Sequence, residues 1–364
     1  MRIIFFIGTV DLLLSSLGYL YYRHQLPWGR SWWFALGYLI LTLNAMVSRA
    51  LSPNLPHALV KLSAWLEGLW VAFGYYTLLF ALAHLALWLL SKLLPFQLPF
   101  GKIALITLVA SILTVTFGSL NAFSPTIRRE LITTNKLPAG TSYKLALISD
   151  VHLGRILGRS YAEKLTQRLN QLQPDAVLIA GDLIDERIAY VQEENSLAAL
   201  TKLTAPKGVY LAFGNHEYID NPALWQKMVE ANGIKVLRDT SAVIDGQLKI
   251  TGLNDFRFSK SPKALQALAW ENDKYYSVLI DHQPRRMLAA SQTGYDLYLS
   301  GHTHTGQLFP NRQITKRMYL LDYGRASFGQ LTAITSSGYG FWGPPVRTEV
   351  APEIVLIEVV GQRK

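Results

Sequence analysis

The chain has 364 residues, half of them hydrophobic, with a formal net charge of +10 and no cysteine. This length allows a good-sized domain plus a second region. Without cysteine there is no disulfide, no thiolate nucleophile and no Cys-based zinc site. The 35 lysines and arginines form no basic block and no basic stripe interleaved with aromatic residues, so no nucleic-acid partner is expected.

Charged residues are distributed unevenly along the chain. Residues 1–120 contain seven Lys/Arg and two Asp/Glu, whereas residues 121–364 contain 28 and 23. Four apolar stretches of the first part, 3–22, 31–48, 62–91 and 102–120, are each near or above the ~20 residues needed to cross a bilayer. Six of the nine tryptophans lie in this part, several near the ends of the stretches, as in an aromatic belt. We therefore predict four transmembrane helices within residues 1–120.

Four spans would place the N-terminus and the following domain on the same side of the membrane. That side carries six of the Lys/Arg near the spans and the other side carries four, a small bias toward the cytoplasm. Asp11 lies inside the first stretch and no small-x-small site precedes the second, which argues against a cleavable signal. The sequence thus predicts a multi-pass membrane protein with the bilayer as a partner. The alternative is a very apolar soluble helical domain, which would have almost no polar face.

Residues 121–140, NAFSPTIRRELITTNKLPAG, contain two prolines and a glycine, which predicts a linker over 121–141. Over 142–364, short β-branched runs alternate with amphipathic stretches, the pattern of an α/β domain. The runs KLALIS, AVLIA, VYLAF, SVLID and YDLYLS predict strands, as do LTAITSS and EIVLIEVV near the C-terminus. SYAEKLTQRLNQL and NPALWQKMVEAN predict helices with Ser160 and Asn221 as N-caps.

Five of the predicted strands end in side chains that bind metal ions. The strands are followed by Asp150 and His152, by Asp182, by Asn215 and His216, by His282, and by His302 and His304. All five histidines of residues 121–364 lie in these loops, and the carboxyl ends of strands in open α/β sheets are where sites form. A chance gathering of structural histidines is the alternative. We predict a metal site.

The types of ligand narrow the chemistry. Two carboxylates, an Asn and several imidazoles suit Mn²⁺, Fe, Zn²⁺ or Mg²⁺ rather than copper. The set offers more ligands than one ion needs, and one carboxylate bridging two divalent ions roughly 3.5–4 Å apart would account for them. Such a pair of ions holds a phosphoryl group and lowers the pKa of a water molecule between them.

The motifs SDVHLG, GDLID, GNHE, DHQP and SGHTHTGQ occur in an order and spacing that resembles the calcineurin-like metallophosphoesterase superfamily. The resemblance covers about residues 142–364, and GFWGPPVR adds a likeness to the bacterial membrane-associated phosphodiesterase branch. It implies a four-layer α/β/β/α sandwich, with manganese among the candidate ions. It also implies a hydrolase of phosphodiester or pyrophosphate bonds that is attached to the bacterial inner membrane.

The resemblance implies a role for each motif residue. Asp150, His152 and His304 would hold one ion, Asn215, His282 and His302 the other, with Asp182 bridging them and His216 protonating the leaving group or stabilising the phosphate. Asp185 and Glu217 are expected to support the ligands rather than to bind an ion.

Two further residues are candidates for substrate binding. Arg155 would bind a substrate phosphate through two hydrogen bonds, or else be a solvated loop arginine. Trp342 would form a wall of the site, or else lie in a rigid loop that positions the last strand.

A membrane anchor beside this site favours a lipid-linked phosphodiester or pyrophosphate as the phosphoester substrate. In the lipid A pyrophosphatase pattern an Arg follows the Asn, whereas this chain has His216, which argues against assigning that substrate. One alternative is a non-catalytic receptor or scaffold, which predicts lost ligands. Another is a transporter or sensor regulated by the soluble domain, which predicts paired charges inside the spans. Asp11, Glu67 and His84 are the candidates for such charges.

Overall fold

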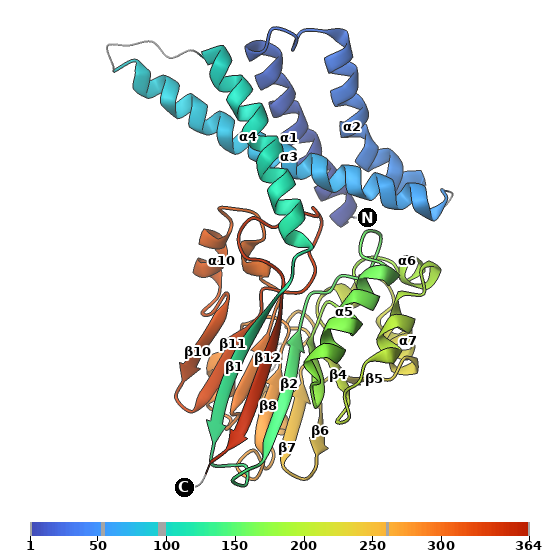
Figure 1. Ribbon diagram of the computed structural model, residues 1–364, viewed down its shortest axis with the longest axis vertical. Coiled ribbons are helices and arrows are strands. Elements are labelled where there is room, and N and C mark those ends of the chain that lie inside the picture. Colours follow the sequence, from blue (N-terminus) through green and yellow to red (C-terminus); the bar gives the residue numbers. More distant parts are fainter. Residues whose placement is uncertain (1, 52–54, 94–99, 260–261, 363–364) are drawn as a thin grey trace. The chain divides into compact units, whose positions relative to one another are not determined.

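The computed structural model describes residues 2–51, 55–93, 100–259 and 262–362. The chain divides into two compact units, shown in Figure 1. One comprises Met1–Asn121 and Gly343–Thr348, and the other comprises Ala122–Trp342 and Glu349–Lys364.

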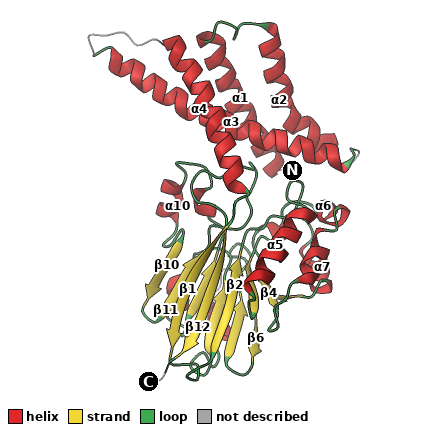
Figure 2. Cartoon of the chain, in the orientation of Figure 1, coloured by secondary structure: helices red, strands yellow, loops and turns green. Residues whose placement is uncertain are grey.

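The described part of the first unit is helical (Figure 2). It consists of α1 (Arg2–Gln25), α2 (Trp32–Leu51), α3 (His57–Ser91) and α4 (Phe100–Ala122). A helix therefore covers each of the four apolar stretches. Among the described residues, two helices, His57–Ser91 and Lys102–Ala122, are long and apolar enough to cross a membrane. The crossing of all four stays a prediction.

A short segment from the C-terminal part of the chain, Gly343–Thr348, belongs to this helical unit. The N–H of Arg347 donates to the carbonyl of Gly118 in α4 at 2.8 Å, and the side-chain amide of Asn121 donates to the carbonyl of Arg347 at 2.9 Å. Gly68 of α3 lies so close to Pro345 that a side chain there would collide with it. The segment is thus bound to two helices that precede it by more than 200 residues.

The second unit contains two six-stranded sheets. The first has the order β1 (Thr126–Thr134), β12 (Glu353–Gly361), β2 (Ser142–Ile148), β3 (Ala176–Ala180), β4 (Val209–Ala212) and β5 (Ile234–Leu237). Strands β2 to β5 are parallel, β12 is antiparallel to β2, and β1 is parallel to β12.

The predicted linker is wrong over Thr126–Thr134, because these residues form β1. All nine of them pair in register with β12, and Ile132 is buried among the core side chains. The partner strand lies more than 200 residues away in the sequence, so the local composition around Pro125 and Pro138 gave no sign of the pairing.

The second sheet is also mixed. Its order is β10 (Gly324–Phe328), β11 (Leu331–Thr335), β9 (Leu297–Ser300), β8 (Tyr276–Ile280), β7 (Leu248–Gly252) and β6 (Thr240–Ile244). Strands β11, β9, β8 and β7 are parallel, while β10 and β6 run antiparallel at the two edges.

Helices and short 3₁₀ turns connect the strands. They are α5 (Arg159–Leu172), α6 (Ile188–Glu193), η2 (Ser196–Lys202), η3 (His216–Tyr218), α7 (Pro222–Ala231), α8 (Pro262–Leu268), α9 (Met287–Ser291), η4 (His304–Gly306) and α10 (Arg312–Met318).

Asn221 caps α7 as predicted, because its side chain accepts the N–H of Leu224. The prediction of Ser160 as an N-cap is wrong: α5 begins at Arg159, whose N–H donates to Glu194 at 2.7 Å.

Alternate residues of a strand face opposite sides of a sheet, so each sheet buries apolar side chains on both of its faces. One apolar layer lies between the two sheets, and one more lies between each sheet and the helices outside it. Leu178 of β3 and Leu248 of β7 lie in the layer between the sheets. Ile179 of β3 packs with Leu165 of α5 on the outer face of the first sheet, and Leu279 of β8 packs with α9 on the outer face of the second. The predicted α/β/β/α sandwich is confirmed.

The layer between the sheets can be tested by truncating one side chain. Leu248 is fully buried, so Leu248→Ala should lower the free energy of unfolding by about 2–5 kcal/mol through lost burial and a cavity. Leu288 is 58% exposed, and Leu288→Ala should change it by no more than about 0.5 kcal/mol. The measurement is the urea midpoint of the full chain in detergent, followed by tryptophan fluorescence. Equal shifts in the two variants would contradict the sandwich core.

Candidate metal centre

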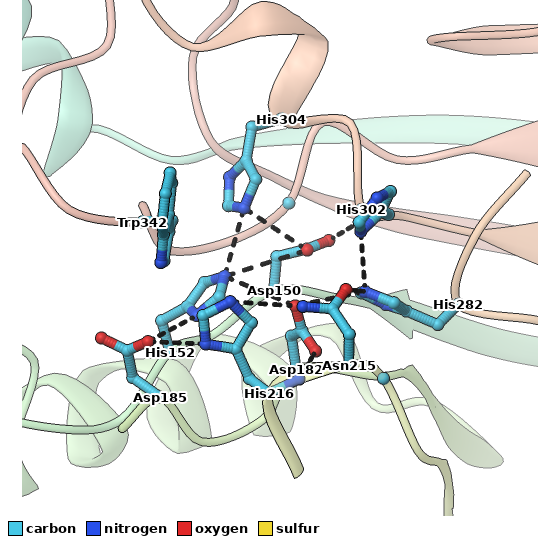
Figure 3. A network of polar contacts seen from close by, with 12 residues as sticks. Asp150, His152, Asp182, Asp185, Asn215, His216, His282, His302, His304 and Trp342 are labelled. Carbon is cyan, nitrogen blue, oxygen red and sulfur yellow. Dashed lines mark hydrogen bonds and ion pairs between the residues drawn. The ribbon is translucent and has the colours of Figure 1, made fainter. Parts of the chain in front are cut away.

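Every predicted ligand follows a strand at the same edge of the second unit. Asp150 and His152 follow β2, Asp182 follows β3, Asn215 and His216 follow β4, His282 follows β8, and His302 and His304 follow β9. Figure 3 shows these side chains pointing toward one another. Both sheets therefore contribute ligands to one site.

The first group of ligands is Asp150, His152 and His304. The Nε2 atoms of the two histidines lie 3.1 Å apart, and Nε2 of His304 lies 3.4 Å from Oδ1 of Asp150. Ligands that each bind a tetrahedral ion at about 2.0–2.1 Å lie about 3.3 Å from one another. The group thus has the spacing that one ion requires.

The second group surrounds Nε2 of His282. This atom lies 3.1 Å from Oδ2 of Asp182, 3.1 Å from Nδ1 of His302 and 3.2 Å from Oδ1 of Asn215. Nδ1 of His282 donates to the carbonyl of Ala180 at 2.8 Å, which leaves the lone pair of Nε2 for an ion.

Asp182 connects the two groups. It belongs to the second group and also to a third, with His152 and His216, in which the ligand atoms all lie within 4.8 Å of one another. Its Oδ2 is 3.9 Å from Nε2 of His152 in the first group. Oδ1 of Asp150 is buried and accepts no hydrogen bond from the described residues. The side chains present therefore fit two divalent ions, with Asp182 placed between them.

The backbone at the ligands adopts a conformation that residues other than glycine seldom adopt. Asp150, His152, Asp182, His302 and His304 have φ angles of 52°, 52°, 51°, 71° and 45°. A positive φ disfavours an L-residue and persists where the surrounding structure stabilises it, most often at functional sites. Five of the seven predicted ligands thus adopt this strained conformation.

Two glycines allow the loops to approach the carboxylates. A methyl group on Gly214 would collide with Asp182, and one on Gly301 would collide with Asp150. Only a residue without a side chain fits at these two positions. The glycines that precede Asn215 and His302 thus permit the ligands to converge.

Glu217 binds the loops after β3 and β4 together. Its fully buried carboxylate accepts the N–H groups of Asp182 at 3.0 Å, Leu183 at 2.8 Å and Gly214 at 2.6 Å. Burial, together with the nearby charge of Asp182, raises the pKa of Glu217 to about 7. Glu217 fixes the backbone on both sides of the ligands, and its hydrogen bonds within the described structure are to backbone N–H groups rather than to ligand side chains.

Asp185 positions His216. Its Oδ1 lies 2.7 Å from Nδ1 of His216 and 3.5 Å from Nδ1 of His152. Burial alone would lower the pKa of His216, but the carboxylates of Asp182 and Asp185 outweigh it and raise this pKa to about 9. His216 is therefore protonated at neutral pH, with Nδ1 toward Asp185 and Nε2 3.9 Å from Asp182.

The ligands themselves have shifted pKa values. Burial would raise the pKa of Asp182, but the neighbouring His282 and His216 hold it well below its usual range. Burial, with the like charge of His282, lowers the pKa of His302 to about 3. A carboxylate that stays ionised and an imidazole that stays neutral are the forms that bind a metal ion.

The sequence pattern did not assign Asp185 and Glu217 to specific partners. Their supporting role was predicted, but the contact of Asp185 with two imidazoles and the backbone contacts of Glu217 were not. Their positions in GDLID and GNHE, beside a ligand in each case, were the available signal.

The two predicted substrate-binding residues lie in different surroundings. Arg155 is buried and forms an ion pair with Glu186 at 2.8 Å, so its role toward substrate stays a prediction. Trp342 is 44% exposed, and its ring centroid lies 6.2 Å from that of His216. The side-chain amide of Gln307 accepts from the N–H of Trp342 and donates to its carbonyl. Figure 3 places this ring beside the histidines.

The family model described as calcineurin-like phosphoesterase matches residues 143–306, a range that contains all seven predicted ligands and His216. The chain contains a calcineurin-like phosphoesterase domain. The resemblance predicted from the five motifs is thereby confirmed. The groups around Asp182 are the residues available to hold two divalent ions as cofactors.

Known relatives share this domain. An uncharacterised metallophosphoesterase of Campylobacter jejuni is 33% identical over 227 residues, which are 60% of this chain and 60% of that protein. A transmembrane protein with metallophosphoesterase domain from Danio rerio is 30% identical over 279 residues, 71% of this chain and 62% of that protein. The match thus spans about three fifths of each relative.

One solved structure among the similar folds is a dimetal phosphatase from Danio rerio. It has a TM-score of 0.35 and 13% sequence identity, over 57% of this chain and 88% of that chain.

The contact between His216 and Asp185 predicts a pH dependence of stability in the metal-free protein. The pKa of His216 is about 9 when folded, against 6.5 ordinarily. Its stabilisation is therefore fully present below pH 6.5 and is lost as the pH rises through 9. The free energy of unfolding of the wild type minus that of His216→Gln should fall across this window by up to ~3 kcal/mol.

The measurement is urea unfolding of the EDTA-treated chain on both sides of the window. His282, whose pKa is also raised, is present in both proteins, so the difference reports the charge of His216 together with its coupling to His282 through Asp182. Asp185→Asn should remove much of the dependence. A difference between wild type and His216→Gln that does not change with pH would contradict the ion pair.

Proposed function

We propose that this chain is a membrane-anchored phosphoesterase that hydrolyses a phosphodiester or pyrophosphate bond with water activated at a two-metal centre. The observation that supports this most strongly is the position of Asp182 between two groups of ligands. The separation of those groups suits a pair of ions that hold one phosphoryl group between them. A non-catalytic receptor predicts lost ligands, whereas this chain retains all seven together with His216.

When bound, two divalent ions supply a lowered pKa for the attacking water and positive charge for the phosphoryl oxygens. The protein residues perform the remaining steps. His216, oriented by Asp185 through Nδ1, would donate a proton from Nε2 to the leaving oxygen. Glu217 keeps the loops that carry Asp182 and His216 in register.

The rim of the site supports a role in substrate binding for Trp342. The ring is exposed and adjoins His216, while Gln307 fixes its backbone. A flat apolar surface there suits the non-phosphate part of a substrate. Arg155 is the weaker candidate for a phosphate contact, because Glu186 already neutralises its charge.

The membrane part of the proposal rests on the apolar helices. Two of them have the length and composition of membrane spans, and the relatives from Danio rerio and Bos taurus are named as transmembrane proteins with a metallophosphoesterase domain. We propose a multi-pass protein of the bacterial inner membrane with a cytoplasmic catalytic domain. A lipid-linked phosphoester is the substrate that such an anchor favours.

The two-metal reaction predicts specific losses of activity. The full chain is stripped of metal and supplied with Mn²⁺, Zn²⁺, Mg²⁺ or Fe²⁺, and hydrolysis of bis(4-nitrophenyl) phosphate is compared with that of 4-nitrophenyl phosphate. Asp182→Asn should lower kcat by about 1000-fold or more, because the bridging charge is lost. His216→Gln should lower kcat by about 100- to 10,000-fold while the metal content stays unchanged.

The matched control is Asp245→Asn. Asp245 is an acid in the β6–β7 turn that pairs with Lys207 at 2.6 Å and contacts no ligand. This variant should keep the activity of the wild type. Metal binding without hydrolysis of either ester, or full activity in Asp182→Asn, would contradict the proposed function.

A further inference from the structure

Three arginines near the metal centre differ in their partners. Arg155 pairs with Glu186 at 2.8 Å, and the buried Arg286 pairs with Asp281 at 2.5 Å. Arg285 is exposed and has no ion pair with a carboxylate among the described residues. It is the one of the three whose charge is available to a ligand.

Arg285 is nevertheless held in place. Its guanidinium carbon lies 4.8 Å from the ring centroid of Tyr319 and 5.7 Å from that of Phe256. Its Nε donates to Oε1 of Gln283 at 3.1 Å, and an Nη donates to the hydroxyl of Tyr319 at 3.3 Å. Gln283 is itself anchored, because its side chain donates to the buried Asp255 at 2.8 Å. Aromatic faces and neutral acceptors thus fix the cation without neutralising it.

The fixed guanidinium still has hydrogen-bonding capacity. Arginine carries five N–H donors, and the described contacts of Arg285 use two of them. The remaining donors suit an anion that accepts two hydrogen bonds in one plane, as a phosphate does.

Arg285 is also close to the second group of ligands. It lies three residues after His282 in the loop that follows β8. The ring centroid of Tyr319 is 6.0 Å from that of His302, at an interplanar angle of 82°. A single aromatic ring therefore separates the guanidinium from a ligand of the metal centre.

We propose that Arg285 binds a second phosphate group of the substrate, beside the phosphoester that is hydrolysed. This inference rests on the proposed function and narrows its substrate to molecules that carry two phosphate groups. Gln283, Phe256 and Tyr319 position the guanidinium for that group. A substrate with a single phosphate would leave the cation unused.

Two synthetic substrates that differ by one phosphate test the proposal. Thymidine 5′-(4-nitrophenyl phosphate) and its 3′-phosphorylated form release the same nitrophenolate. In the wild type, the 3′-phosphate should lower KM and raise kcat/KM. Arg285→Ala should reduce the ratio of kcat/KM for the two substrates by about tenfold or more, since a hydrogen-bonded charged group is lost. Arg285→Lys should restore part of the ratio through charge alone.

Arg317→Ala is the matched control. Arg317 is an exposed arginine of α10, two residues before Tyr319, and its loss removes the same net charge. This variant should keep the ratio of the wild type. A ratio that is unchanged in Arg285→Ala, or that falls equally in Arg317→Ala, would overturn the proposal.

A binding measurement separates this proposal from the proposed function. Isothermal titration calorimetry of the metal-loaded full chain compares thymidine 3′,5′-bisphosphate with thymidine 5′-monophosphate. The bisphosphate should bind about tenfold or more tightly to the wild type and lose this advantage in Arg285→Ala. Absence of hydrolysis with this difference in binding would contradict the enzyme and support the subsite. Equal affinities for the two nucleotides would overturn the subsite.

Discussion

The convergence of ligand lone pairs is the constraint on which the rest of the second unit depends. Nitrogen and oxygen atoms of the ligand side chains face one another at 3.1–3.9 Å in buried loops. Buried polar atoms at such distances are stable only when positive charge lies among them. In the metal-free protein, protons on His216 and His282 supply that charge, which is why their pKa values are raised. Metal ions and protons therefore compete for the same site.

Two acids hold the ligand-bearing loops in place although the lone pairs of the ligand atoms repel one another. Glu217 accepts backbone N–H groups from the loops after β3 and β4, and Asp185 orients the rings of His152 and His216. Neither acid is needed as a ligand, yet both determine where ligand atoms lie. The positive φ angles at Asp150 and Asp182 indicate that this fixed geometry is maintained at a cost in backbone strain.

The ion-pair partner of each arginine near the metal centre determines whether its charge is available to a ligand. Arg155 follows the first motif and has the right chemistry for a phosphate, but Glu186 occupies its guanidinium. Arg285 directly follows the DHQP motif, and aromatic rings rather than a carboxylate contact its guanidinium, so its charge is available. Both arginines directly follow a motif, so sequence position was a poor guide to which of them pairs with a carboxylate, because that pairing involves residues distant in the sequence.

The sequence alone was sufficient to predict most strands and the gathering of the candidate metal ligands. Alternation of apolar residues and the placement of the five histidines of residues 121–364 after strands determine which residues meet, because parallel strands end at a common edge. The Asn221 cap was likewise predictable, since an N-cap acts on the three residues that follow it. Only the tertiary structure decided the strand Thr126–Thr134, the start of α5 at Arg159, the association of Gly343–Thr348 with α3 and α4, and the partners of Asp185, Glu217 and the arginines. Each of these features depends on a contact between segments that lie far apart in the sequence. Local propensity determines where a helix or strand forms and which of its faces is apolar, whereas pairing between distant segments determines which polar groups find hydrogen-bond or ion-pair partners.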